Sequence, residues 1–139
     1  TVMAALRLAS YGNPIFAEES IANLLTSLML LIQKQPAGFG FRLQAMDWYL
    51  GPVDQIVLAS PPGGDHDLAP FIEALHRSWK PRQVLAVSRG DSDLHLPAML
   101  EGKEPIQGQT TAYACRSFVC KQPVFLPSHL IEILEKGDL

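Results

Sequence analysis

The sequence has only two cysteines in 139 residues, too few for the disulfide framework of a small secreted domain. It has no run of more than two basic residues and a net charge of −3, so it lacks the electrostatic footprint of a nucleic-acid-binding protein. No apolar stretch reaches the roughly 20 residues that span a bilayer, and no secretory signal stands at the start. We therefore expect a cytoplasmic protein with neither nucleic-acid nor membrane partners.

What is present is a globular composition, with 47% hydrophobic and 18% charged residues. The chain begins within an expected helix, residues 1–10, which indicates a piece of a longer protein. A second helix is predicted over residues 13–35. Asn13 can cap its free N–H groups, and Pro14 suits the first helical position, where no N–H is needed.

The predicted helices are too apolar to cover one another. Residues 24–32 of the second helix are apolar nearly all round, which indicates burial on more than one side. A third helix is predicted after Pro36, with a single apolar stripe made of Phe39, Leu43, Met46 and Leu50. We expect one face of the second helix to associate with a second copy when the piece is free; this face carries Leu24, Leu28, Leu31 and Ile32.

The second half of the sequence, residues 52–139, has a different pattern of apolar residues. The short apolar run 55–60 is typical of a strand that is covered on both faces, and residues 83–88 are predicted to form a second strand. A helix is predicted between them, so the segment indicates a βαβ unit. Residues 110–120 are predicted to add a third strand, and residues 128–136 a last helix.

These elements predict a fold class between α+β and α/β. Residues 1–51 would be a helical domain, the end of a larger helical assembly. Residues 52–139 would be a small three-layer α/β subdomain with a mostly parallel sheet of three to four strands.

Three phrases of the sequence carry a family resemblance. They are Met46-Asp47-Trp48-Tyr49-Leu50-Gly51-Pro52, Leu100-Glu101-Gly102-Lys103, and Thr111-Ala112-Tyr113-Ala114-Cys115 continued through Cys120 and Pro123. The chain resembles the C-terminal region of a family that joins a thioredoxin-like domain to an α/α-toroid. That toroid is like those of N-acylglucosamine 2-epimerases and six-hairpin glycosidases, and the mammalian family member is called spermatogenesis-associated. Family members usually have a valine where this chain has Ala114.

The resemblance implies that the helical half is the end of the toroid and that the thioredoxin-like domain is missing. It implies a non-catalytic C-terminal structural fragment without a cofactor, whose partners are the missing N-terminal domains of the same chain. One alternative is a thiol redox module that uses Cys115 and Cys120. Another is part of a carbohydrate-active enzyme, epimerase-like or glycosidase-like, with a role in carbohydrate metabolism.

The two cysteines have three interpretations: buried structural thiols, a redox or disulfide pair, or half of a metal site. Five positions apart, their side chains would point to opposite faces of a regular strand. A disulfide would therefore need a turn, predicted at Arg116-Ser117, to bring the Cα atoms within about 7 Å. Arg116 would then be placed to stabilise a thiolate. Zinc needs about four ligands, and His129 is the nearest histidine in sequence, so structural thiols are the simplest interpretation and no metal is expected.

A second candidate site follows from topology, because ligands bind beyond the carboxyl ends of strands in open α/β sheets. Two loops, 61–67 and 89–95, should meet there. Together they carry carboxylates and imidazoles that could bind a cation or act in acid–base chemistry: Asp65, His66, Asp67, Asp91, Asp93 and His95. The simpler interpretation is that Asp65 or Asp67 caps a helix and that the other loop contains turns.

Overall fold

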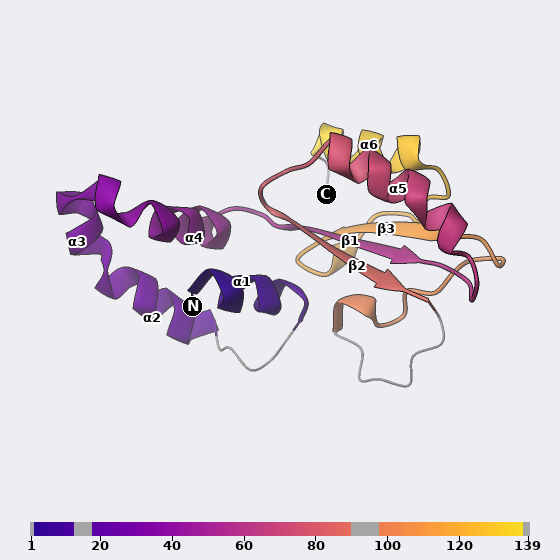
Figure 1. Ribbon diagram of the computed structural model, residues 1–139. Coiled ribbons are helices and arrows are strands. Elements are labelled where there is room, and N and C mark those ends of the chain that lie inside the picture. The colour runs from indigo at the N-terminus through magenta and orange to yellow at the C-terminus, as the bar shows by residue number, and fades with distance from the viewer. Residues whose placement is uncertain (1, 13–17, 90–97, 138–139) are drawn as a thin grey trace. The chain divides into compact units, whose positions relative to one another are not determined.

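The computed structural model describes residues 2–12, 18–89 and 98–137. The chain divides into two compact units, Thr1–Pro52 and Val53–Leu139. The boundary between them lies next to the predicted one, which follows residue 51. Each unit has its own buried residues. Figure 1 shows the helices α1 to α4 of the first unit and the sheet with α5 and α6 of the second.

The regular secondary structure in the described residues of the first unit consists of helices. It contains α1 (Val2–Ser10), α2 (Glu18–Ser27), α3 (Met29–Lys34), the 3₁₀ helix η1 (Pro36–Phe39) and α4 (Gly40–Leu50). Its buried apolar residues are Leu6, Ile21, Leu25, Ile32, Ala45 and Trp48.

Trp48 ties α4 to α1. Its indole Nε1 donates a hydrogen bond of 3.4 Å to the Ser10 hydroxyl, and the Arg7 guanidinium lies 5.4 Å from the centre of its ring. A cation over an indole face is electrostatically favourable, so this contact stabilises the packing of α1 on α4 beyond what burial of the ring contributes.

The prediction of a single helix over residues 13–35 is wrong, because the helix is interrupted at Leu28 between α2 and α3. The Thr26 hydroxyl donates to the Ala22 carbonyl at 2.9 Å, and the Ser27 hydroxyl donates to the Leu24 carbonyl at 2.8 Å. Hydroxyls that bond back to helix carbonyls compete with the backbone ladder and bend helices. The predicted cap, Asn13 with Pro14, lies outside the described residues.

The apolar faces predicted for the helices also need correction. In α4 the buried residues are Ala45 and Trp48, whereas Leu43 and Leu50 of the predicted stripe are exposed. In the predicted association face Ile32 is buried, and Leu24 and Leu31 are exposed. Periodicity showed which residues share a face, but packing against α1 and α2 decided which face is covered.

The second unit contains a four-stranded sheet and two helices, so its class is α+β. Its elements are β1 (Asp54–Ala59), α5 (Asp65–Arg77), β2 (Gln83–Ser88), the 3₁₀ helix η2 (Ala98–Leu100), β3 (Thr111–Arg116), β4 (Val119–Cys120) and α6 (Pro127–Lys136). The strand order is β2-β1-β3-β4. All six residues of β1 are buried, which confirms the prediction of a strand covered on both faces.

The prediction of a mostly parallel sheet is wrong. β1 and β2 are parallel, but β3 is antiparallel to β1 and β4 is antiparallel to β3. Ala59 pairs with Ser88 at the end of β2 and with Thr111 at the start of β3. The chain therefore leaves β2 and enters β3 at the same end of the strands. A connection that stays at one end makes the two strands antiparallel.

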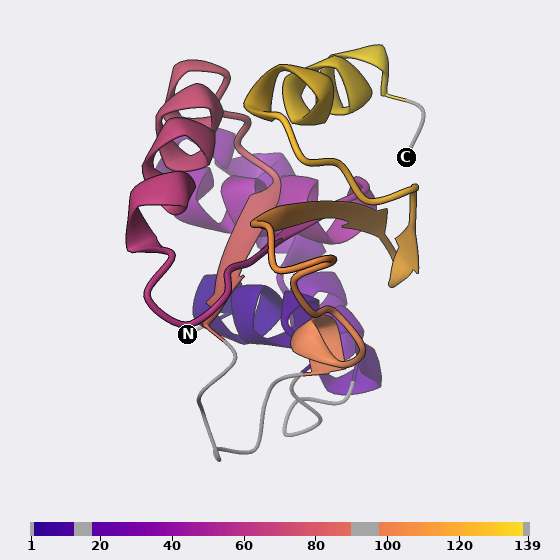
Figure 2. The same ribbon diagram turned by 90° about the vertical axis from the view of Figure 1, so that its right-hand side faces the viewer.

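The predicted three-layer arrangement is also wrong, because α5 and α6 lie on the same face of the sheet (Figures 1 and 2). The cluster between these helices and the sheet contains Ile56, Leu58, Leu68, Phe71, Leu75, Ala112, Ala114, Leu130 and Leu134. Successive strand residues point to opposite faces, so Gln55, Val57 and Cys115 lie on the other face. The short helix η2 is on that side (Figure 2).

The described helices include none with the combination of length and hydropathy that a membrane crossing requires.

Candidate functional site

The two cysteines lie on a β-hairpin at the edge of the sheet. Ser117 and Phe118 connect β3 to β4, and their φ angles are 50° and 64°. Two successive positive φ angles are the conformation of a type I′ turn, which suits the twist of a two-residue hairpin. Neither residue is the glycine or asparagine that usually fills such positions. The turn was therefore predicted one residue too early, at Arg116-Ser117.

Cys115 and Cys120 form a disulfide bond. The hairpin places them directly opposite each other on adjacent antiparallel strands, with 3.9 Å between their Cα atoms. Opposite residues of such a pair point to the same face of the sheet. The turn therefore removes the objection that an offset of five separates the two side chains. The interpretation as two free buried thiols does not hold for this structure.

The two halves of the disulfide differ in exposure. Cys115 is 2% exposed in the body of β3, whereas Cys120 is exposed on the edge strand. Its neighbours Phe118 and Val119 are also exposed, at 50% and 75%. A thiol in solution attacks the sulfur that it can reach, so this asymmetry favours attack at Cys120.

Gln55 of β1 supports the hairpin from the same face of the sheet. It pairs in register with Cys115, so Gln55, Cys115 and Cys120 form one row across β1, β3 and β4. Its side-chain Oε1 accepts a 2.9 Å hydrogen bond from the backbone N–H of Phe118 in the turn. Gln55 is only 4% exposed, so the acceptor residue of this bond is buried, whereas the donor residue Phe118 is half exposed.

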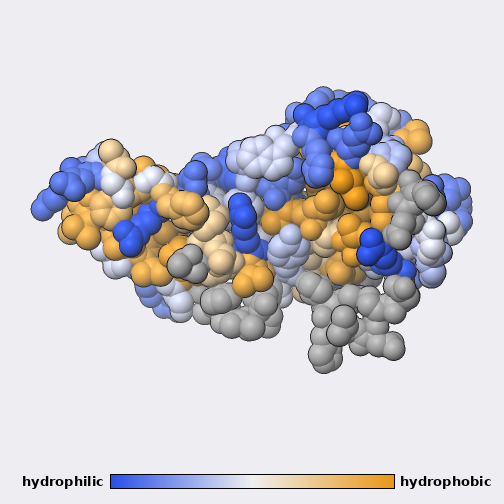
Figure 3. All heavy atoms as spheres, in the orientation of Figure 1, coloured by the Kyte–Doolittle hydropathy of each residue, from blue (hydrophilic) through white to orange (hydrophobic). Residues whose placement is uncertain are grey.

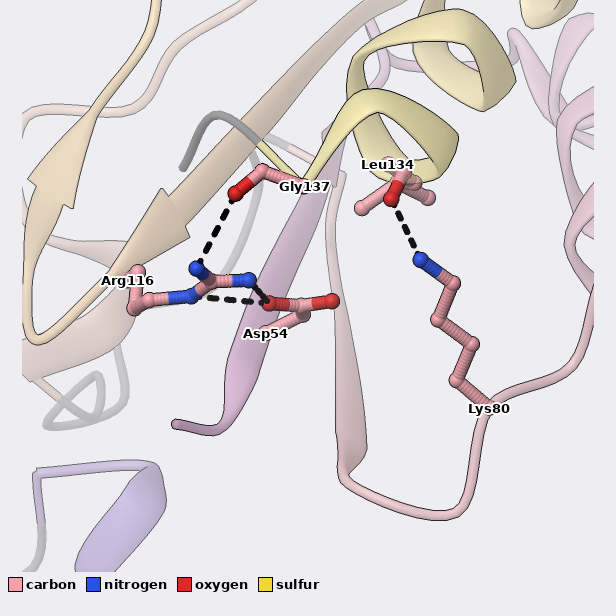
Figure 4. A network of polar contacts seen from close by, with 5 residues as sticks. All are labelled: Asp54, Lys80, Arg116, Leu134 and Gly137. Atoms are coloured by element: carbon pink, nitrogen blue, oxygen red, sulfur yellow. Dashed lines mark hydrogen bonds and ion pairs between the residues drawn. The ribbon is translucent and has the colours of Figure 1, made fainter. Parts of the chain in front are cut away.

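Asp54 and Arg116 hold the same hairpin from the helix-covered face (Figure 4). The Arg116 Nη2 and Nε donate to Asp54 Oδ1 at 2.6 and 3.1 Å, and its Nη1 donates to the Gly137 carbonyl at 3.3 Å. Asp54 is 5% exposed, so its carboxylate depends on this partner. Nearby, the Lys80 ammonium donates to the Leu134 carbonyl of α6.

This network corrects the role predicted for Arg116. Consecutive strand residues point to opposite faces, so the guanidinium lies on the face away from the sulfur of Cys115. Its bonds to Asp54 and Gly137 make it a clamp between β3, β1 and the end of α6. A thiolate at Cys115 would not lie beside it.

The predicted ligand loops are only partly described. Asp65, His66 and Asp67 form the first turn of α5, and its N-cap residue is Gly64. The prediction that Asp65 or Asp67 is the N-cap of this helix is therefore wrong. The side chains of Asp65 and His66, and the residues Asp91, Asp93 and His95, lie outside what the structure describes. Whether the two loops meet therefore stays a prediction.

Asp67 borders a cavity of about 300 Å³ near the C-terminal end of β1. The cavity is lined by Asp67, Pro70, Phe71, Gly108, Gln109, Thr110, Phe125 and Pro127. Thr110 is 5% exposed, and its hydroxyl has no hydrogen-bond partner among the described residues. Within residues 2–12, 18–89 and 98–137 no group of three or more His, Cys, Asp or Glu side chains is placed to hold a metal ion.

Two further groups near the sheet have shifted pKa values. Burial raises the pKa of Tyr113 in β3, and a hydrogen bond with the Glu104 backbone partly opposes this shift. The Tyr113 hydroxyl also donates a 2.6 Å hydrogen bond to the Glu104 carbonyl. Burial lowers the pKa of Lys103, opposed by the nearby charge of Glu101. The sequence carried no signal for either shift, because each depends on tertiary contacts.

No protein-family model, curated protein or solved structure matches this chain.

Proposed function

We propose that this chain is a non-catalytic, structural C-terminal piece of a larger protein with a thioredoxin-like domain and an α/α-toroid. Its helical unit would supply the last toroid helices, and its α/β unit would close the toroid. The missing N-terminal domains would then be its partners.

The observation that carries this proposal is the apolar surface of the helical unit. Leu30, Phe41 and Leu50 are 73%, 74% and 76% exposed, and Leu24, Leu31 and Leu43 are also exposed. Figure 3 shows apolar side chains gathered over this unit. Full burial of one such side chain stabilises a protein by about 1.5–3 kcal/mol. The number of exposed apolar side chains on this unit therefore favours a helical partner that covers them.

A groove in the same unit is suited to receive that partner. Its volume is about 480 Å³, and its walls are mostly apolar, with Val2, Met3, Leu24, Leu28, Gly38, Phe39, Phe41, Arg42 and Ala45 lining it. A helix lays its apolar face into a groove of this kind, with anchors about one turn apart.

The first prediction concerns the free chain, whose helical face should pair with a second copy when its natural partner is missing. We expect light scattering to show a mass that rises with concentration. Phe41→Asp should shift the association midpoint to at least tenfold higher concentration, because a carboxylate would have to be desolvated.

Val119→Asp is the matched control, because Val119 is equally exposed but lies in the other unit. It should leave the association unchanged. A wild-type chain that is monomeric at every concentration would contradict the proposal, as would equal effects of the two variants.

A second candidate function, thiol–disulfide exchange in a reducing cytoplasm, is favoured by the asymmetric disulfide. Cytosolic disulfides are rare and are usually transient and catalytic or redox-sensing. A partner thiolate would attack the Cys120 sulfur, the S–S bond would break, and Cys115 would leave as a thiolate. The partner's second thiol would then resolve the mixed disulfide, leaving the partner oxidised and both cysteines reduced.

The second prediction tests which sulfur is open to attack. In Cys115→Ser the remaining Cys120 thiol should react with N-ethylmaleimide at least tenfold faster than the Cys115 thiol does in Cys120→Ser. The reason is that Cys115 is buried and Cys120 is exposed. Mass spectrometry of timed samples measures both rates, and equal rates would count against exchange at Cys120.

A further inference from the structure

We infer that Gln55 is a positioning residue that keeps Cys115 and Cys120 together after their disulfide is reduced. This inference rests on the candidate function of thiol–disulfide exchange. Gln55 would allow the two cysteines to cycle between dithiol and disulfide without refolding of the hairpin.

The turn between the cysteines needs support from outside the hairpin. Ser117 and Phe118 both have positive φ angles, which residues with a Cβ disfavour. β4 has only two residues, so few strand contacts oppose the relaxation of this turn. While the disulfide is intact, the covalent bond fixes the loop. Once it is reduced, other contacts must hold the loop.

Gln55 makes such a contact. Its Oε1 accepts the hydrogen bond from the N–H of Phe118, inside the four-residue loop that the disulfide closes. Gln55 itself is fixed, because it lies in the buried central strand β1 and directly opposite Cys115. The bond therefore anchors the loop to a rigid part of the sheet, whatever the redox state of the sulfurs.

This anchoring has a thermodynamic consequence. The equilibrium between dithiol and disulfide depends on the effective concentration of one thiol at the other in the reduced protein. A frayed loop lowers that concentration and makes the disulfide easier to reduce. When Gln55 holds the loop, the two thiols stay opposite each other. If an oxidant forms a mixed disulfide at Cys120, the Cys115 thiolate can then attack the Cys120 sulfur and displace the oxidant as a thiol.

The test is the equilibrium constant for oxidation of the folded protein by oxidised dithiothreitol, measured by alkylation of free thiols and mass spectrometry. Gln55→Met keeps the length of the side chain but cannot accept the bond from Phe118. We expect it to lower this constant about fivefold, which corresponds to about 20 mV for a two-electron couple. Gln55→Glu retains an acceptor oxygen and should stay within about twofold of the wild type.

Leu130→Ala is the control for general destabilisation, because Leu130 lies in the core on the other face of the sheet. It should lower the denaturation midpoint but leave the oxidation constant unchanged. An unchanged constant in Gln55→Met, or an equal fall in Leu130→Ala, would overturn the role of Gln55. Slow exchange of the wild-type disulfide with a protein dithiol would instead overturn the exchange function, while the dithiothreitol equilibrium still decides the role of Gln55.

Discussion

Replacing Arg116 with alanine is expected to lower the free energy of unfolding of the α/β unit by about 3 kcal/mol. The variant leaves the carboxylate of Asp54 buried at the start of the central strand without its cation. Removing one partner of a buried pair costs more than the pair contributes, since the remaining charge stays desolvated. It also removes the bond to the Gly137 carbonyl at the end of α6. Urea denaturation followed by circular dichroism measures the loss.

The pair Arg77–Glu73 provides a matched control for this prediction. Its nitrogen–oxygen distance is also 2.6 Å, but its side chains are 78% and 64% exposed. Exposed pairs are screened by water and salt, so Arg77→Ala should cost less than about 1 kcal/mol. If both variants lost the same small amount, burial of Asp54 would not be what makes Arg116 important.

Leu130→Ala is expected to destabilise the same unit by about 3 kcal/mol. Leu130 is fully buried in α6, in the cluster with Ile56, Leu58 and Leu134. The shortened side chain loses its transfer free energy and leaves a cavity that a central strand and two helices cannot easily close. The urea midpoint of the variant, with the slope of the transition unchanged, gives the size of the effect.

Leu126→Ala removes the same atoms four residues earlier, where the side chain is 51% exposed. We expect a change of less than about 0.5 kcal/mol there, because little surface returns to water. A large effect at Leu126 would show that the segment before α6 is packed more tightly than its exposure indicates. A small effect at Leu130 would contradict the position of the core between the helices and the sheet.

The candidate site could be found from the sequence only in part. Cys115 and Cys120 stand out because they are the only cysteines, and their separation requires a turn before they can bond. Gln55 could not be recognised, because a polar residue at the start of an apolar strand carries no mark of a contact with residue 118. The misplaced turn has a similar reason, since Ser117 and Phe118 lack the residue types that usually mark positive φ angles.

The sequence by itself determined the local elements of the α/β unit. The continuous apolar run of β1 requires cover on both faces, and the following helix and β2 satisfy the pattern of a βαβ unit. Gly137 ends α6 in the left-handed conformation that glycine adopts without strain. Each of these features depends on residues close in sequence, which is why the pattern predicts them.

Tertiary structure alone decided the direction of β3, the placement of both helices on one face, and the burial of Ile32. A strand pattern of period two is the same for parallel and antiparallel pairing, and an apolar helix face does not specify its neighbour. The disulfide belongs to the same group. Its two sulfurs meet because the hairpin folds at Ser117 and Phe118, and that fold is held by Asp54 and Gln55, more than 60 residues away in the chain.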